Sequence, residues 1–580
     1  MPSIVLCTLN AKYIHASLGL RYLLANMGEL RAQTALREFT IARKPQDVVD
    51  ELVRTLDGAD TAADPAMPAP AGACSPQIIG FGVYIWNVTQ TCEVVRLLKA
   101  QRPAVKIVLG GPEVSHELDG QNIVHLADHV ITGWGDVSFP KLCRALLHGP
   151  QPLMKIITGE QPPLRQIALP YAEYTDADLA HRVLYVEASR GCPFKCEFCL
   201  SSLDKTAWAF ELDAFLAELD TLYQRGARNF KFVDRTFNLK IDASVRILQF
   251  FLDRLPTKCN IGVVQDSGVP IHAKTGPAAR NLFVHFEVIP DHLPDLLKAM
   301  IAQFPPGVLQ FEIGIQTFNV EVQQRISRRQ DNDKTVVNLR WLVDGSNAHL
   351  HTDLIFGLPG ETIASFADGF DRLYALRPHE IQLGILKRLR GTPIARHTVV
   401  HGMVYDRDPP YTVLQTSVVS ALEMRRFTRL ARYWDLFANS GRFKASLSML
   451  FAHHGPENLL HTAMVAQTPS PFYAFLDFSD WLWQTTRKTS GLTPELLLDH
   501  LFDYLTKIHQ TDPQTARKVL LADYLQSGAR ANPASLQALL RKRCAPLDGS
   551  TPALVARQGR HARAQGGVLK PGWVRQSRFS

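Results

Sequence analysis

Hydrophobic positions in residues 1–150 alternate between short apolar runs and stretches with the 3.6-residue spacing of an amphipathic helix. The apolar runs predict strands, and the stretches between them predict helices. The predicted strands are Ser3–Thr8, Glu38–Ile41, Ile78–Ile85, Lys106–Leu109 and His129–Thr132, and the predicted helices are Ile14–Leu30, Gln46–Leu56, Thr89–Ala100 and Val137–Leu147. This order predicts an α/β domain with a doubly wound parallel sheet and helices on both faces.

Strand and helix patterns resume over residues 181–398, after a proline-rich stretch at 151–180 that predicts a linker. About six βα units in a row favour a partial or full (β/α) barrel over a second open sheet. The predicted strands are Leu184–Ala188, Phe230–Val233, Asn260–Val264, Phe283–Val288, Gln310–Ile315, His351–Ile355 and Glu380–Leu386, and the predicted helices are Leu212–Tyr223, Ser244–Leu255 and Leu293–Gln303. Reactive loops are therefore expected at the carboxyl ends of these strands.

The strand patterns fade after Asp406, and residues 399–545 predict a helical C-terminal domain. Its predicted helices are Val413–Ala438, Ser470–Thr489, Thr493–Ile508 and Ala516–Tyr524. Residues 546–580 predict a basic, disordered tail. From Arg541 onward nine Lys and Arg face one acid, Asp548, so this end of the chain carries the whole net charge of +8. Nucleic-acid contact by the tail is the alternative, which the lack of interleaved aromatic residues disfavours.

Composition narrows the class of protein further. Hydrophobic residues are 46% and charged residues 20%, which is ordinary for a globular chain. No apolar run approaches the roughly 18 residues of a membrane span. Met1–Asn10 lacks the basic region and cleavage site of a signal peptide. The Ala/Pro-rich Thr61–Gln77 predicts a surface insertion. The nine cysteines are an odd number, which argues against a disulfide framework. We therefore expect a cytoplasmic protein that does not associate with membranes.

Three of the cysteines, Cys192, Cys196 and Cys199, fall within eight residues directly after a predicted strand. A 4Fe–4S cluster normally takes four protein thiolates, so three ligands would leave one iron open to bind a small molecule. Gly191 permits the tight loop before the first ligand. The alternative is a structural zinc site with Cys259 as the fourth ligand, but no second close cysteine pair accompanies it.

The segment Arg-Gly-Cys192-Pro-Phe-Lys-Cys196-Glu-Phe198-Cys199 resembles the C-x3-C-x2-C motif of the radical S-adenosylmethionine (radical SAM) superfamily, aromatic Phe198 included. The resemblance implies a 4Fe–4S cluster held by the three cysteines. It also implies reductive cleavage of S-adenosylmethionine to a 5′-deoxyadenosyl radical. A low-potential electron donor such as a flavodoxin or ferredoxin would then be a partner.

Further strand ends match the same superfamily and imply residues that contact S-adenosylmethionine. Asp234 ends one predicted strand, although a helix N-cap is its alternative role. Glu312 and Gln316 lie in the segment that resembles the strand flanking the ribose. Asp353 and Gly357 lie in the next, where glycines would let the backbone approach the adenine, although each glycine could equally serve a turn. Leu386–Pro393 resembles the last barrel strand and its exit loop.

The N-terminal sheet resembles the Rossmann-like cobalamin-binding domain that precedes the barrel in one branch of the superfamily. The resemblance implies a cobalamin contact at Asn10, Tyr84, Asn87, Gly110, Gly111, Pro112, Gly133 and Gly135. These residues lie in loops at the carboxyl ends of parallel strands, where such sheets bind ligands. The D-x-H-x-x-G motif that supplies a histidine to cobalt in many cobalamin proteins is absent. His15 is a candidate ligand, but a helix-start or core role suits it better.

The sequence as a whole resembles a group of cobalamin-type radical SAM proteins that carry a helical C-terminal domain of unknown function. We expect an enzyme that methylates, cyclises or rearranges an unidentified substrate. A two-cluster RNA methylthiotransferase is the alternative, with Cys7, Cys74 and Cys92 for its second cluster. A nucleic-acid-binding protein with a structural metal is the third possibility. The sequence identifies no general base, and nucleic acid is not the expected partner.

Overall fold

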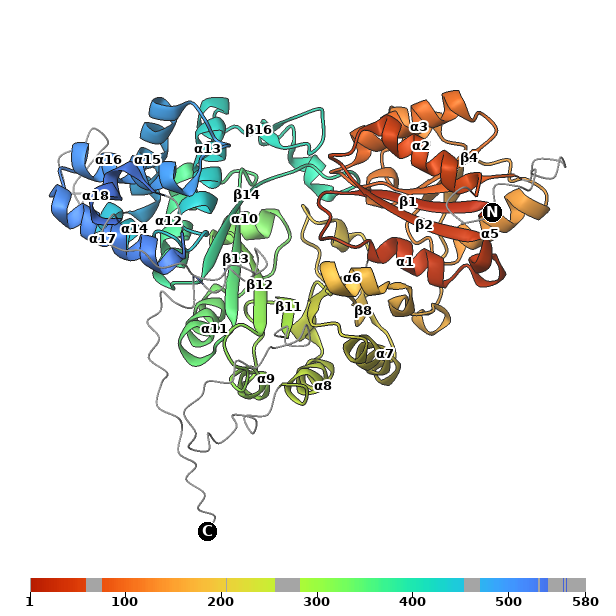
Figure 1. Cartoon of the computed structure of the whole chain (residues 1–580), viewed down its shortest axis with the longest axis horizontal. Helices are drawn as coiled ribbons and strands as arrows, with labels where there is room; N and C mark the ends of the chain where they lie inside the picture. The colour runs from red at the N-terminus through yellow and green to blue at the C-terminus, as the bar shows by residue number, and fades with distance from the viewer. Residues whose placement is uncertain are drawn as a thin grey trace, which may run out of the picture. The chain divides into compact units, whose positions relative to one another are not determined.

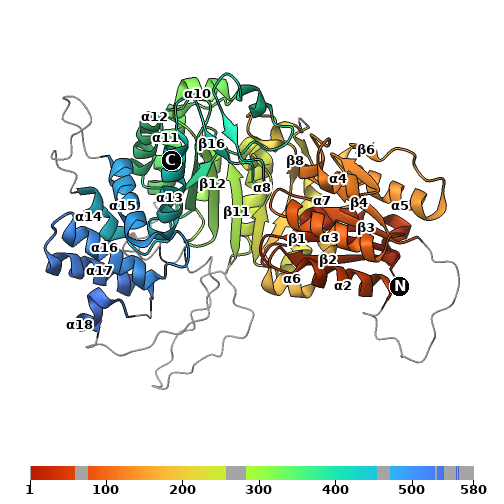
Figure 2. The same ribbon diagram turned by 90° about the horizontal axis from the view of Figure 1, so that it is seen from above.

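The computed structural model describes residues 2–58, 76–204, 206–255, 282–452, 470–529 and 532–540, together with Arg557 and Arg560. The chain divides into two compact units. Figures 1 and 2 show their helices and strands, coloured by position along the chain. The first comprises Met1–Met300, Gln324–Arg329 and Leu386–Val413. The second comprises Ile301–Gln323, Gln330–Ile385 and Leu414–Ser580.

The first unit opens with a six-stranded parallel sheet in the order β2-β1-β3-β4-β5-β6. Its strands are β1 Ile4–Asn10, β2 Thr34–Thr40, β3 Ile78–Gly82, β4 Lys106–Gly110, β5 His129–Thr132 and β6 Ile156–Thr158. Its helices are α1 Leu18–Ala25, α2 Pro45–Leu56, α3 Val88–Gln101, α4 Asn122–Leu126 and α5 Ser138–His148, and α6 Asp176–His181 follows. The five predicted strands are confirmed, whereas β6 and α6 lie in the stretch 151–180 predicted as a linker.

Alternate residues of the central strands point to opposite faces of this sheet and meet different helices. On one face Val5 and Leu9 of β1 share a core with residues of α2 and α3. On the other face Ile4 and Leu6 share a core with residues of α1 and α5. Helices therefore cover both faces (Figure 1), and the predicted doubly wound fold is confirmed.

The first unit continues with three parallel strands, β7 Leu184–Val186, β10 Asn229–Phe232 and β11 Phe283–Val288. The hairpin of β8 Ser189–Arg190 and β9 Trp208–Ala209 follows β7. Phe232 of β10 packs its ring against Phe215 of α7 Leu212–Gln224 and against Phe251 of α8 Ile241–Leu252. These helices therefore cover the apolar face of the strands. The helix α9 Asp295–Ile301 and the strand β15 Val404–Tyr405 are further elements among the described residues of this part.

The second unit holds another parallel set, β12 Leu309–Gln316, β13 His349–Phe356 and β14 Glu380–Ile385. The helices α10 Val320–Arg325, α11 Asn332–Gly345 and α12 Ile363–Ala375 alternate with them. The helices described in the C-terminal region are α13 Ala421–Phe437, α14 Lys444–Ala452, α15 Pro471–Thr486, α16 Pro494–Lys507, α17 Pro513–Ser527 and α18 Gln537–Leu540. Phe427 of α13 stacks on Phe356 of β13 with ring centroids 3.8 Å apart.

The predicted helix Val413–Ala438 begins later than the sequence pattern indicated. Val413–Gln415 forms the short strand β16, and the helix starts at Ala421 because Ser420 and Glu423 form a capping box. The predicted strand Asn260–Val264, most of the insertion Thr61–Gln77 and nearly all of the tail 546–580 lie outside the described residues. The domain boundaries inferred from the sequence stay predictions. Within the described residues, no helix has the length and apolar character needed to cross a membrane.

A buried ion network ties α1, β2 and α6 together in the first unit. The Arg21 guanidinium, 2% exposed, lies 2.8 Å from Glu38 and 2.9 Å from Asp178. Arg182 lies 2.6 Å from the same Glu38 oxygen. Burial alone would raise the pKa of Glu38 and of Asp178, but the adjacent Arg21 charge keeps both pKa values below their ordinary range. Each carboxylate therefore depends on this arginine.

We predict that Arg21→Ala lowers the free energy of unfolding by about 3–5 kcal/mol, because it leaves buried carboxylates without their main partner. Arg31→Ala is the matched control, since Arg31 is 46% exposed and pairs with Glu173 at the surface. It should cost no more than about 1 kcal/mol. Denaturant unfolding measures both, and equal losses would contradict the prediction. Because Arg21 lowers the two pKa values, its contribution is lost as the pH falls through them, so acidification below about pH 4 should narrow the difference from wild type.

Candidate functional site

The three clustered cysteines lie in one loop that follows β7 and β8. Gly191 precedes them with φ near +90°, and a Cβ there would lie 2.6 Å from Thr206 Oγ1 and 2.7 Å from the Ala207 nitrogen. Another residue at this position would therefore clash. The Cys192 N–H donates to the Asp204 carbonyl oxygen at 3.1 Å, and the Cys199 N–H donates to the Cys196 carbonyl oxygen at 3.1 Å. The predicted close grouping of the cysteines along one loop is thus present.

The thiol groups of this loop are reduced and partly shielded from solvent. Cys192 is buried, and Cys196 and Cys199 are half-buried and form no disulfide. Burial raises the pKa of Cys196, and the Arg328 guanidinium, 3.7 Å from its sulfur, acts in the opposite direction. Within the described residues, no three His, Cys, Asp or Glu side chains are grouped closely enough to hold a single metal ion. A cubane cluster places each thiolate on a separate iron, so it does not require that grouping.

Glu197, inside the cysteine motif, anchors the loop to two distant segments of the same unit. Its carboxylate accepts hydrogen bonds from Ser327 Oγ at 2.6 Å and from Arg396, and lies 2.9 Å from His397 Nε2. Its N–H donates to the Ile326 carbonyl oxygen at 3.0 Å. The side chain is only 4% exposed, so these partners satisfy a buried charge. The sequence does not indicate this role because the carboxylate's partners lie far along the chain, Ser327 being 130 positions away and His397 200.

Asp234, a predicted S-adenosylmethionine contact, holds the start of the same loop. One of its oxygens accepts from the Ala188 N–H at 3.0 Å, and the other accepts from Ser189 Oγ at 2.6 Å. Burial raises the pKa of Asp234 to about 7, although both hydrogen bonds favour the ionised form. The structure thus shows a loop-supporting role, and a contact with S-adenosylmethionine stays a prediction.

The other predicted S-adenosylmethionine residues lie on adjacent strands of the second unit, except for half-buried Phe198 within the cysteine loop. Glu312 and Gln316 belong to β12, Asp353 belongs to β13, and Gly357 directly follows β13 with φ near +84°. The β12–β13 register shifts between Gly314 and Gln316, and Gln316 has φ near +68°. Such a bulge re-aims a side chain. Gln316 Oε1 is buried and accepts no hydrogen bond within the described part of the chain.

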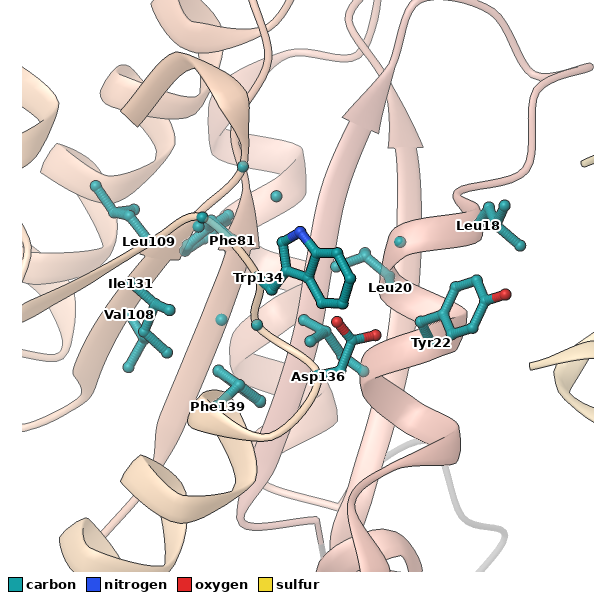
Figure 3. A pocket seen from close by; sticks show the side chains of 18 of the residues that line it. Leu18, Leu20, Tyr22, Phe81, Val108, Leu109, Ile131, Trp134, Asp136 and Phe139 are labelled. Carbon is teal, nitrogen blue, oxygen red and sulfur yellow. The ribbon is translucent and has the colours of Figure 1, made fainter. Parts of the chain in front are cut away.

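A cavity of about 320 Å³ lies at the carboxyl ends of β3, β4 and β5 in the first unit (Figure 3). Its floor is apolar, with Phe81, Val108, Ile131 and Phe139. Figure 3 shows Leu18, Leu20 and Tyr22 of α1 across from these side chains. Five predicted residues line the cavity, namely Tyr84, Gly110, Gly111, Gly133 and Gly135. The structure therefore brings these five positions together around one cavity, and their contact with cobalamin stays a prediction.

The remaining predicted cobalamin residues, Asn10, Asn87 and Pro112, do not line the cavity. The Asn87 side chain is completely buried and donates to the Leu9 and Gly82 carbonyl oxygens at 3.0 and 3.1 Å, so it fastens β1 to β3. The Asn10 amide donates to the His15 carbonyl oxygen at 2.9 Å. These asparagines support the loops, and their contact with a ligand stays a prediction.

Sequence analysis missed several polar cavity residues, among them Asp136, Glu187 and Arg190, whose charges pair with one another. In the described part of the chain no histidine lines the cavity. His15 lies elsewhere, with its Nδ1 atom 2.6 Å from the Tyr185 hydroxyl. Its pKa is lowered mainly by burial and, to a smaller extent, by the positive charge of Lys231. The preferred structural role for His15 therefore agrees with its position.

Residues 186–373 match the family model of the radical SAM superfamily. The chain contains a radical SAM domain. Residues 400–546 match a second model, a protein of unknown function (DUF4080). The predicted resemblance, with a C-terminal domain of unknown function behind the barrel, is thereby confirmed. Domains of the radical SAM type use a 4Fe–4S cluster and S-adenosylmethionine, as the cysteine motif implied.

Relatives of known activity match the chain at low identity. The 2-(S-pantetheinyl)-carbapenam-3-carboxylate methyltransferase of Streptantibioticus cattleyicolor is 23% identical over 338 residues, which cover 53% of this chain and 46% of the relative. The cobalamin-dependent radical SAM methyltransferase TokK of Streptomyces tokunonensis is 23% identical over 354 residues, which cover 56% and 49%. The chain thus spans about half the length of these relatives.

A solved structure of the radical SAM methyltransferase TsrM from Kitasatospora setae, bound to cobalamin and a [4Fe-4S] cluster, is similar in fold. The TM-score is 0.50 with 14% sequence identity, over 73% of this chain and 83% of TsrM. At this identity the likeness concerns the fold alone. It agrees with an α/β protein that has parallel sheets and a helical C-terminal region.

We predict that Glu197→Ala makes a reconstituted cluster leave the protein about tenfold faster, because the loop loses charge-assisted hydrogen bonds to Ser327, Arg396 and His397. Iron release to a chelator under anaerobic conditions measures the rate. Lys195→Ala is the matched control, since Lys195 lies in the same loop and is exposed. Identical release rates from the two variants would contradict the role of Glu197.

Proposed function

We propose that the chain is a radical SAM enzyme that binds a 4Fe–4S cluster, S-adenosylmethionine and cobalamin, and methylates a substrate still to be identified. The observation that carries the proposal is the loop of Cys192, Cys196 and Cys199 next to the glycine-lined cavity, since Arg190 of β8, two positions before Cys192, lines that cavity. Methylation is favoured over cyclisation or rearrangement because both curated relatives named above are methyltransferases.

The chemistry of the cysteine loop fits a cluster with one open iron. Three thiols and no fourth motif cysteine would hold three irons. Glu197 and Asp234 fix the loop from both sides, which limits the motion of the thiols. Gln316 presents a buried oxygen without a hydrogen-bond partner among the described residues, as expected of a residue that receives a polar ligand. It is therefore the strongest S-adenosylmethionine candidate of the second unit.

The cavity suits the nucleotide tail of a cobalamin better than a small polar metabolite. Its floor is formed by apolar and aromatic side chains, and its rim by backbone that glycine leaves open. At Gly110, a Cβ would lie 3.9 Å from the nearest atom, so the space above the strand is vacant of protein atoms. The lack of a lining histidine within the described residues agrees with cobalamin held without a protein histidine.

When bound, the three cofactors would supply a 5′-deoxyadenosyl radical and a methyl group for transfer, and a low-potential flavodoxin or ferredoxin would supply electrons. The protein's part is positioning. The cysteine loop orients the open iron, and the strand ends of the second unit bind S-adenosylmethionine. The cavity at the carboxyl ends of β3, β4 and β5, hereafter the front cavity, holds cobalamin.

The two-cluster RNA methylthiotransferase is not favoured. Cys7 lies inside the apolar core of the first sheet, where burial raises the pKa of its thiol. Cys92 sits on α3 and packs against the same core. Cys74 lies outside the described residues. A buried thiol such as Cys7 is inert and makes a poor cluster ligand, and Cys92 is half-buried on a helix that faces the core.

We predict that the anaerobically reconstituted protein contains about four irons per chain and that Cys196→Ala contains almost none. Cys92→Ala is the matched control and should keep the wild-type content, because Cys92 lies on a helix away from the motif. Iron and sulfide analysis with the cluster absorption band measures this. About eight irons in wild type would favour the two-cluster alternative, and zinc would overturn the enzyme assignment.

We predict that Gly110→Leu raises the dissociation constant of hydroxocobalamin about tenfold or more, because the new side chain fills the cavity. Lys106→Leu on the same strand is the control, since Lys106 does not line the cavity. Absorbance titration measures both constants. If the two variants bind hydroxocobalamin equally well, the cavity is not its site.

A further inference from the structure

One loop of the first unit serves both the front cavity and the cysteine loop. Gly133–Asp136 follows β5, and all four of its residues line the cavity. Trp134 donates from Nε1 to Asp204 Oδ2 at 2.8 Å. Asp136 Oδ2 lies 2.9 Å from Arg190 Nη1. Both partners belong to the hairpin region that surrounds the first cysteine.

Asp204 connects Trp134 to Cys192, because it forms a hydrogen bond with each of them. Its carbonyl oxygen accepts the Cys192 N–H at 3.1 Å. Its second carboxylate oxygen accepts from the Thr206 N–H at 3.0 Å and lies 2.7 Å from Thr206 Oγ1. The same hydroxyl lies 3.2 Å from the Arg190 carbonyl oxygen. Asp204 thus holds the backbone after Gly191 directly, and it holds the backbone before Gly191 through Thr206.

Arg190 forms the second connection, two positions before Cys192. Its guanidinium lies 4.7 Å from the Trp134 ring centroid and 4.6 Å from that of Tyr22. It pairs with Asp136 at 2.9 Å and with Glu187 at 2.8 Å, at 15% exposure. A charge so enclosed tolerates little displacement, because loss of either partner leaves it buried with only part of its compensation. A shift of the Trp134–Asp136 loop must therefore change the backbone that precedes Cys192.

From these contacts we infer that the front cavity and the cysteine loop are energetically coupled, with Trp134 and Asp204 as positioning residues. A corrinoid in the cavity favours the loop arrangement that holds the cluster, and the cluster in turn favours corrinoid binding. The inference rests on the proposed function and adds to it a fixed relation between the two cofactors. Linkage requires the coupling to be the same in both directions.

The test compares hydroxocobalamin affinity in cluster-free and cluster-loaded protein, by anaerobic absorbance titration. Wild type should bind hydroxocobalamin about fivefold or more tightly when the cluster is present. Trp134→Phe keeps an aromatic ring over Arg190 but removes the donor to Asp204, and Asp204→Ala removes the acceptor. In both variants the ratio of the two dissociation constants should fall toward one.

Two further measurements separate coupling from general damage. Trp483→Phe on α15 of the second unit is the matched control and should keep the wild-type ratio. Saturating hydroxocobalamin should slow chelator-driven iron loss from wild type and Trp483→Phe, but not from Trp134→Phe. Each ratio compares the dissociation constants of the cluster-free and cluster-loaded forms of one variant. A substitution that weakens hydroxocobalamin binding equally in both forms therefore leaves the ratio unchanged.

The outcomes distinguish this inference from the proposal beneath it. Wild-type protein that binds hydroxocobalamin equally with and without the cluster would overturn the coupling and leave the proposed function standing. Wild-type protein that binds a cluster but no hydroxocobalamin would overturn the cobalamin proposal and the coupling together. An unchanged ratio in both Trp134→Phe and Asp204→Ala would show that the coupling does not pass through these residues.

Discussion

Buried charges next to the cysteine motif impose the constraint on which the candidate site depends. Arg190, Glu197 and Asp234 are all shielded from solvent, and each must find partners or lose stability. The partners come from the six-stranded sheet domain of the first unit, from residues 324–329 and 393–397, and from the residues at the start of the cysteine loop. A short, glycine-containing loop with weak structure of its own is thereby fixed from several sides.

Local patterns are enough to predict β1 to β5 of the first sheet, the longer strands that follow it and the cysteine motif, because alternation of apolar residues and short ligand spacing are properties of contiguous sequence. Partners far along the chain leave no such pattern. The Glu197–His397 contact joins residues 200 positions apart. Asn87 shows the same limit from another side: its amide donates to carbonyl groups of two strands, a supporting role that its position at a strand end did not indicate.

The front cavity shows why glycine positions were easier to foresee than its polar lining. Gly111 has φ near +109°, and a Cβ there would lie 2.5 Å from the Val83 carbonyl oxygen, so the sequence must place glycine at this turn. Glu187 and Arg190 enter the cavity from beyond β7. Their presence follows from how the sheet and the β7 loop pack within one unit, which no single stretch of sequence encodes.

The C-terminal helices of the second unit complete the strands that carry the predicted S-adenosylmethionine residues. β14 ends its sheet, and the Asn439 side chain both accepts from the Ile381 N–H at 3.0 Å and donates to the Ile381 carbonyl oxygen at 2.9 Å. An amide side chain so placed replaces a neighbouring strand at an otherwise open edge. Phe427 packs on Phe356 at the end of β13, next to Gly357. The helical region is therefore a structural part of the strand set, although α13 begins only at Ala421, well after the end of β14 at Ile385.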